Sequence, residues 1–211
     1  MTKVRLAGFG LAAAAAFTLT ACGSGVAAPS VGAAIPMAPA PSAGMSGTPD
    51  GVTTDADVFG PACVRLPQGS APGSLASMRP QPVVSAAATN PLLTRMVAAV
   101  KAANLIDTLD SRQAITVFAP ADAAFAVLDE ANPTELVPLL EYHVAGKRYD
   151  AKGLATAGSV ASLDSAGGPL KIEGSGENMT IDGAKILCGN IPTKNATVFV
   201  IDKVLTPGTT G

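Results

Sequence analysis

The sequence predicts an α+β domain in which early helices pack on a small sheet made mainly of late strands. Two observations support this class. Between Asn90 and Tyr142, apolar residues recur at the spacing of helices that bury one face. After Tyr142, short runs of strand character are separated by Gly, Asn and Asp, which is typical of strands joined by turns. Helices that precede strands favour an α+β class over alternating α/β units.

The N-terminus has the features of a bacterial export signal. Two basic residues precede an uncharged, mostly apolar run at 6–20, shorter than the roughly 20 residues of a membrane-spanning helix. The run ends in LTAC, which resembles the lipobox, an aliphatic residue and two small ones before a cysteine. We expect a signal peptide at 1–21 and a lipid on Cys22. The alternative is an ordinary secretory signal cut at a nearby small residue.

Residues 22–79, including Cys63, are predicted to form a tether between the lipid and the domain. The segment is rich in Ala, Pro, Gly, Ser and Thr, and it carries no charge before Asp50. Too few large apolar side chains are present to offset the entropy lost on folding. Both a plain spacer and an O-glycosylated one fit this composition. The domain is expected at 80–207, followed by a tail at 208–211.

Helix-start signals follow one another through the first half of the predicted domain. Asn90-Pro91 has the cap-then-proline signature, and apolar residues follow at helical spacing through Val100. A short helix is expected near 105–109, and Asp122 is expected to cap another that carries Phe125 and Leu128. The last predicted helix begins at Asn132-Pro133, runs through Leu140 and is interrupted by Pro138.

The strands are predicted from β-branched and apolar runs bounded by turn residues. One early strand is expected at 114–118, closed by Ala119-Pro120. The later strands are expected at 159–163, 170–173, 179–181, 185–188 and 197–205. Residues 80–207 are enough for one hydrophobic core, so a single domain is predicted.

The two cysteines other than Cys22 are expected to pair. An exported protein lies in an oxidising compartment, where Cys63 and Cys188 would form a disulfide. Closing a loop of about 125 residues contributes on the order of 5 kcal/mol in the chain-entropy account. Two buried free thiols are the alternative.

The composition argues against several classes of function. Lys and Arg number 14 against 16 Asp and Glu, without the basic block that indicates nucleic-acid binding. A single histidine, His143, excludes a three-histidine metal site and the two-histidine motif of metalloproteases. The sequence contains no G-x-S-x-G nucleophile motif. We therefore expect a protein that is not an enzyme and that uses no metal or cofactor.

Three stretches of the chain together resemble the fasciclin domain family. ITVFAPADAAF at 115–125 resembles the family's first signature, LLEYHV at 139–144 its central Tyr-His element, and NATVFVIDKVLTP at 195–207 its second signature. The chain looks most like the mycobacterial-type fasciclin surface antigens, some of which are lipid-anchored and have a cysteine pair that brackets the domain. The segment between Phe125 and Tyr142 is short for the family, which predicts abbreviated middle helices.

The resemblance implies a cell-surface protein that is lipid-anchored at the extracytoplasmic face of the cell membrane, or partly released from it, and that presents its domain for binding or adhesion. The partners would be proteins or surface glycans of the envelope, the matrix or a host. Tyr142 and His143 are the binding candidates, because the family's Tyr-His element has been tied to adhesion. The structural alternative is a buried pair at a helix-to-strand junction. The alternative function is an envelope-anchored receptor for a small apolar or lipid ligand.

One basic group in the chain has two possible roles. Lys147, Arg148 and Lys152 lie close together in the sequence. They would either contact anionic envelope polymer or lipid headgroups, or form a solvated loop.

Overall fold

The computed structural model describes residues 50–127 and 133–208 of the chain. The predicted signal peptide, the lipid site at Cys22 and most of the predicted tether lie outside the described residues. Among the residues described, the strands form a seven-stranded sheet in the order β2-β1-β7-β6-β5-β4-β3. They are β1 (Ile115–Pro120), β2 (Val144–Ala145), β3 (Ser159–Ala161), β4 (Pro169–Glu173), β5 (Thr180–Ile181), β6 (Ala184–Pro192) and β7 (Ala196–Ile201).

β1 and β7 form a parallel pair inside the sheet, with Ile115 opposite Ala196 and Pro120 opposite Ile201. Every residue of both strands is buried, which explains why each strand is a nearly unbroken apolar run. The early strand predicted at 114–118 therefore exists, and it continues through the two residues that were expected to close it.

The two edges of the sheet meet. Ala145 of β2 forms an antiparallel bridge with Ser162, just after β3. The backbone N–H of Leu163 donates to the carbonyl of Val144 at 2.7 Å. The closing contact leaves neither edge strand open to pairing with another chain along these residues.

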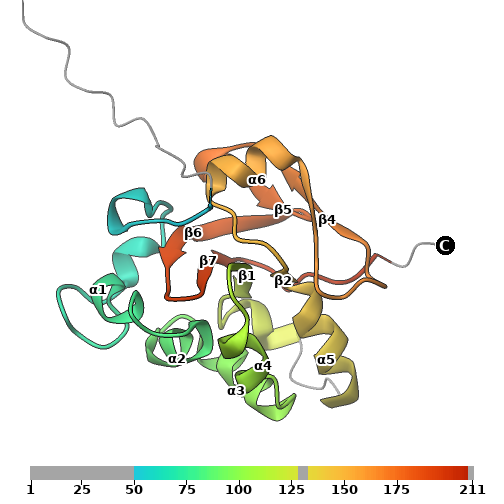
Figure 1. The fold of residues 1–211 in the computed structure, drawn as a ribbon, viewed down its shortest axis with the longest axis horizontal. Coiled ribbons are helices and arrows are strands. Elements are labelled where there is room, and N and C mark those ends of the chain that lie inside the picture. The colour runs from blue at the N-terminus through green and yellow to red at the C-terminus, as the bar shows by residue number, and fades with distance from the viewer. Residues whose placement is uncertain (1–49, 128–132, 209–211) are drawn as a thin grey trace, which may run out of the picture. The chain divides into compact units, whose positions relative to one another are not determined.

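Two hydrophobic cores lie on opposite faces of β1 and β7. Val117 and Val198 face a core that the early helices cover, whereas Phe118 and Phe199 face a second core with α6 and the later strands. The two phenylalanine rings have centroids 5.9 Å apart. Figure 1 shows α1 to α5 on one side of β1 and β7, and α6 with β4 and β5 on the other. Helices and a sheet packed in this way confirm the predicted α+β class.

The described residues contain more helices than were predicted for them. Near 105–109 and from Pro133 the expected helices are present, and Pro138 lies inside the latter. Three short helices were missed, namely α1, α2 and α6, because each has too few residues for a periodic pattern. The helices are α1 (Leu75–Met78), α2 (Val83–Thr89), α3 (Thr94–Ala102), α4 (Ile106–Ser111), α5 (Pro133–Tyr142) and α6 (Ala151–Ala157).

Two capping predictions were wrong. Asn90 ends α2 instead of starting a helix, and α3 begins only at Thr94. Asp122 does not cap the turn that follows it, which is a 3₁₀ helix at Ala124–Val127. Its carboxylate instead accepts from the Thr94 hydroxyl at 2.6 Å and from the Arg95 N–H at 2.9 Å, so it caps α3 from a distance. Leu128 and Asn132 of the predicted helices lie outside the described residues.

The folded part begins upstream of the predicted boundary at residue 80. Leu66 and Met78 are buried in the core under the helices, with 4% and 2% of their surface exposed. Phe59 forms a β-bridge with Gly189, and the Thr197 hydroxyl donates to the carbonyl of Gly51 at 2.8 Å. Residues 51–66, here called the N-terminal strap, thus pack on β6 and β7 and do not belong to a tether. Long-range contacts hold the segment in place, and a local sequence pattern does not reveal them.

Candidate functional site

Tyr142 and His143, the predicted binding residues, lie where α5 ends and β2 begins. The carbonyl of His143 accepts from the N–H of Phe118 on β1 at 2.9 Å, so the junction joins the sheet directly. The predicted position at a helix-to-strand junction is therefore correct. The two side chains, however, point into the protein, with 3% and 1% of the residue surface exposed.

The His143 imidazole connects two distant segments. Its Nε2 accepts from the backbone N–H of Leu205 at 2.9 Å, and its Nδ1 lies 2.7 Å from the carbonyl of Leu139. An Nε2 that accepts requires the tautomer with its proton on Nδ1, which then donates to Leu139. Burial lowers the pKa of His143 to about 4, with the Leu139 hydrogen bond opposing the shift. The ring is therefore neutral at physiological pH.

The Tyr142 phenol is held by a turn between two strands. Its hydroxyl donates to Asp182 Oδ2 at 2.8 Å, while Asp182 Oδ1 accepts from the Lys171 N–H at 2.7 Å. Burial, followed by the hydrogen bond and charge of Asp182, raises the pKa of Tyr142, so the phenol stays protonated. Gly167 lies against the ring, where an added Cβ would come 2.6 Å from a ring carbon.

These contacts connect α5 to the C-terminal segment and to the later strands. A neutral histidine with both ring nitrogens occupied and a protonated, hydrogen-bonded tyrosine are poorly suited to acid–base catalysis. The geometry is that of two satisfied buried polar groups. A binding role for Tyr142 and His143 stays a prediction, and it would require the covering segments to move.

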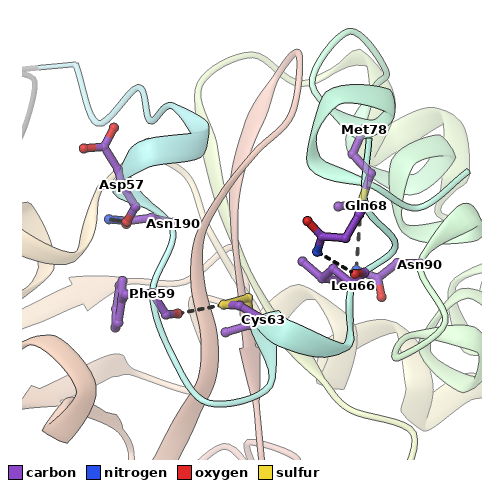
Figure 2. The surroundings of a disulfide bond; sticks show 9 residues. Asp57, Phe59, Cys63, Leu66, Gln68, Met78, Asn90 and Asn190 are labelled. Carbon is purple, nitrogen blue, oxygen red and sulfur yellow. Dashed lines mark hydrogen bonds between the residues drawn. A yellow bond between two sulfur atoms is a disulfide. The ribbon is translucent and has the colours of Figure 1, made fainter. Parts of the chain in front are cut away.

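Cys63 and Cys188 form the predicted disulfide, with Cα atoms 5.1 Å apart (Figure 2). The bond ties the N-terminal strap to β6, and Cys188 is fully buried. Cys63 Sγ lies 3.0 Å from the carbonyl oxygen of Phe59, a close contact without a thiol proton. Nearby, the Asn190 amide donates to the carbonyl of Asp57 at 3.0 Å and accepts from the N–H of Ala151 at 2.8 Å. The strap is therefore fixed covalently and by a buried amide.

A cleft of about 330 Å³ lies beside the disulfide, between the strap and the start of α1. Its walls mix apolar and polar side chains, with Leu66 buried and Asp55 exposed. Asp55 is already paired with Arg79 at 2.7 Å. Figure 2 shows Leu66 and Gln68 on the far side of Cys63 from Phe59. The lining residues are Asp55, Cys63, Leu66, Pro67, Gln68, Gly69, Ser74, Leu75 and Ala76.

A smaller apolar cavity lies between α2, α3 and the sheet. Val97 and Val198 are among the residues that line it, and its volume is about 20 Å³. That volume is close to the space of one water molecule. An acyl chain or another small apolar ligand therefore does not fit without parting the helices from the sheet.

The described residues carry neither a metal cluster nor a membrane span. Within 50–127 and 133–208, no three His, Cys, Asp or Glu side chains lie together as metal ligands. No helix in those same ranges has the length and apolar character needed to cross a bilayer.

Sequence reasoning missed three polar residues that organise these regions, of which Asn190 and Asn195 are buried and Asp182 is exposed. Asp182, Asn190 and Asn195 each bond to backbone groups far away in the chain. The only local signal was the Asp182-Gly183 dipeptide, which is typical of a tight turn. The partners of Asn190 and Asn195 depend on contacts across the fold, which a local pattern does not reveal.

Comparison with known proteins gives consistent matches. The model of the fasciclin domain family matches residues 91–207. The immunogenic protein MPB70 of Mycobacterium bovis is 37% identical over 166 residues, which cover 72% of this chain and 83% of that protein. The cell surface glycolipoprotein MPB83 of the same species is 34% identical over 169 residues, covering 72% of this chain and 73% of that protein.

A solved structure is also similar. The FAS1 domain pair from the insect cell adhesion molecule Fasciclin I matches with a TM-score of 0.47 and 16% sequence identity. The match covers 56% of this chain and 46% of that one.

Proposed function

The chain belongs to the fasciclin family, and on that premise we propose that it displays one fasciclin domain at the cell surface for binding and adhesion, without catalysis. The observation that carries the proposal is its similarity to a protein named a cell surface glycolipoprotein. The neutral, fully bonded His143 supports a non-catalytic role, because it leaves no free base at the family's Tyr-His element.

The proposed anchor is a lipid on Cys22, after removal of a signal peptide at 1–21. The disulfide between Cys63 and Cys188 supports this, because it uses the other two of the chain's three cysteines and leaves Cys22 for the lipid. Stable anchoring takes two acyl chains or a second membrane contact, since one chain alone binds weakly. The protein would then face outward from the membrane, with a spacer up to about residue 50.

The anchor is tested by replacing Cys22. In a bacterial host that processes lipoproteins, Cys22→Ser should abolish labelling by a radioactive fatty acid and leave the precursor uncut. Cys63→Ser serves as the control, because it removes a cysteine of the disulfide and should leave the labelling intact. Lipid labelling of the Cys22→Ser chain would show that the anchor lies elsewhere.

The proposed partners are proteins or surface glycans of the envelope, the matrix or a host. Cells that display the full chain should retain such a partner in a saturable way, and cells that produce the Cys22→Ser chain, which lacks the lipid anchor, should not. Binding that rises in proportion to added partner without saturation would count against adhesion by this domain.

For Tyr142 and His143 we propose a role in shaping the binding surface from inside. Tyr142→Phe removes only the hydroxyl that bonds Asp182, and His143→Gln keeps an acceptor for the Leu205 N–H. Each should weaken partner binding several-fold while the domain still unfolds cooperatively. Unchanged binding by both variants would assign the pair to stability alone.

The alternative, a receptor for a small apolar or lipid ligand, has less support. The apolar cavity of about 20 Å³ is far below the roughly 300 Å³ at which ligand pockets begin. The cleft of about 330 Å³ beside the disulfide reaches that size, but Asp55, Gln68 and Ser74 are among its lining residues, so it is not a purely apolar site. Native mass spectrometry of protein purified from the envelope tests this directly. A reproducible bound mass would favour the receptor over the adhesin.

A further inference from the structure

Three cations lie at one end of the sheet, on loops that the topology brings together. Lys147 and Arg148 follow β2, and Lys194 precedes β7. β2 runs antiparallel to β1, and β1 runs parallel to β7, so the last residue of β2 and the first residue of β7 lie at the same end of the sheet. The Nη2 group of Arg148 donates a hydrogen bond to the carbonyl of Lys194 at 3.3 Å, which joins the two loops directly. We call Lys147, Arg148 and Lys194 the basic rim.

Arg148 is the least well compensated of the three. Its side chain is partly buried, and within the described residues its Nε has neither solvent contact nor a hydrogen-bond partner. The ion pairs Arg79–Asp55 and Lys171–Glu173 do not include it. Burial lowers the pKa of Arg148 and no carboxylate opposes the shift, although the guanidinium remains charged. Proteins rarely leave such a group without a partner.

The loop that carries Arg148 is fixed rather than free. The Thr116 hydroxyl donates to the carbonyl of Lys147 at 2.8 Å and accepts from the N–H of Tyr149 at 2.8 Å. Gly51 lies so close to the carbonyl of Arg148 that an added Cβ would come within 2.5 Å of it. The fixed backbone and the hydrogen bond from the guanidinium to the Lys194 carbonyl together restrict the positions open to the Arg148 side chain before any ligand arrives. This restriction lowers the ordering cost of binding and favours a binding site over a merely solvated loop.

The neighbouring carboxylates offset the charge of the rim only in part, because one of the two is buried. Asp150 is buried, and it accepts from the N–H of Gly153 at 2.7 Å as the cap of α6. Asp50 is exposed and precedes Gly51. Lys147 and Lys194 are both exposed, and the ammonium of Lys147 lies 5.4 Å from the centre of the Tyr149 ring. The accessible charge at this end of the sheet is therefore mainly positive.

We propose that the basic rim binds phosphate groups, with the Arg148 guanidinium as the main ligand and Lys147 and Lys194 as flanking charges. Because Nε is enclosed, the phosphate oxygens would be bound by the Nη groups of the guanidinium, one of which also donates to the Lys194 carbonyl. The lysines add charge without fixed geometry. The rim lies beside Gly51, where the chain enters the domain from its N-terminal segment. The choice of phosphate rests on the proposed anchor at Cys22. A domain tethered to a membrane through its N-terminal segment would meet phospholipid headgroups near the point where that segment enters the domain.

The first test uses the full chain and inorganic phosphate. Phosphate should raise the unfolding temperature above that in chloride of equal ionic strength, since a ligand of the native state stabilises it. Arg148→Met should reduce the apparent phosphate affinity about tenfold, the loss of a charge-assisted pair. Arg148→Lys should give an intermediate loss, and Lys101→Met on α3 removes an equal charge as the control. Lys194→Met provides a second rim variant if Arg148→Met folds poorly.

The second test distinguishes a lipid headgroup from free phosphate. The full chain, inserted in vesicles through its N-terminal segment, is compared in phosphatidylglycerol and in phosphatidylcholine. Lipids with a quencher on the headgroup report on Tyr149, because the chain has two tyrosines and no tryptophan, and Tyr142 is buried. Quenching should be stronger in phosphatidylglycerol, fall in high salt and be lost in Arg148→Met. Tyr149→Phe gives the background signal.

Each outcome decides the proposal. A phosphate effect with lipid-dependent quenching supports the rim as a headgroup site, and a phosphate effect without such quenching supports it as a site for soluble phosphate groups. Equal behaviour of wild type, Arg148→Met and Lys101→Met overturns the proposal. Neither test measures cell adhesion or acylation, so a failure here leaves the proposed adhesin function and the anchor at Cys22 unaffected.

Discussion

His143 is a residue whose chemistry depends strongly on the fold. In the unfolded chain its pKa is near 6.5, and in the folded protein burial lowers it to about 4. Between those values the unfolded state binds the extra proton, so stability rises with pH. The contribution is fully present above pH 6.5 and is lost as the pH falls towards 4. With the ring fully buried, the total amounts to roughly 3 kcal/mol.

This pH dependence can be isolated with His143→Gln, which keeps an acceptor for Leu205 but does not titrate. Denaturant unfolding of both proteins from pH 4 to 7 should show a steeper loss of stability on the acid side for the wild type. The carboxylates of the protein contribute equally to both curves, so their contribution cancels in the difference between them. Parallel curves would mean that His143 does not titrate on unfolding.

Asn195 shows how one buried amide connects several elements. Its Oδ1 accepts from the N–H of Val83 at 2.8 Å, and its Nδ2 donates to the carbonyls of Leu109 and Arg112 at 2.9 and 2.8 Å. Asn195→Asp keeps nearly the same shape, but it replaces the NH₂ group that donates to these carbonyls with an oxygen that can only accept. We expect a loss of about 3 kcal/mol in unfolding free energy.

The matched control for that change is Asn178→Asp, since Asn178 is exposed on a 3₁₀ turn. It should change the unfolding free energy by less than about 0.5 kcal/mol. Both variants are measured by denaturant titration at neutral pH. Similar effects at the two positions would refute the linking role assigned to Asn195.

At the scale of elements, the N-terminal strap depends on its disulfide. The bond closes a separation of 125 residues, so its removal should lower the unfolding free energy by about 3 to 5 kcal/mol. Cys63→Ser combined with Cys188→Ala tests this by denaturant unfolding. Hydrogen exchange should also accelerate at Ala62 and Gly189, whose N–H groups bond across the strap and β6. Exchange that is faster elsewhere but not at these amides would contradict a strap held by the disulfide.

The elements that sequence reasoning found are those with local signals. β1 and β7 were predicted because their burial on both faces requires continuous apolar runs. The cap of α3 was assigned wrongly because its acceptor, Asp122, lies 28 residues after Thr94 in the chain. The disulfide was predicted from the number of cysteines and the expected compartment. The burial of Tyr142 was foreseen as the structural alternative to a binding role, but the segments that cover it were not. The loop at Gly167 and the turn at Asp182 are remote from Tyr142 in sequence.

At the scale of the whole molecule, the strap is part of the domain that it leads into. Its residues contribute to the core beneath the helices and pair with β6 (Figure 1). The family match at 91–207 does not include these residues. A chain without residues 50–79 therefore loses core side chains, the bridge to Gly189 and the partner of Cys188 together.

This predicts different outcomes for two truncated chains. A chain of residues 50–211 should unfold cooperatively with a midpoint close to that of the full chain. A chain of 80–211 should lack a cooperative transition, because Leu66 and Met78 alone account for about 3 to 6 kcal/mol of burial, against the 5 to 15 kcal/mol that stabilises a typical domain. Thermal unfolding followed by circular dichroism measures both, and Cys188→Ala in the shorter chain controls for aggregation through a free thiol. A shorter chain that melts cooperatively near the full-length midpoint would return the domain boundary to residue 80 and make the strap dispensable.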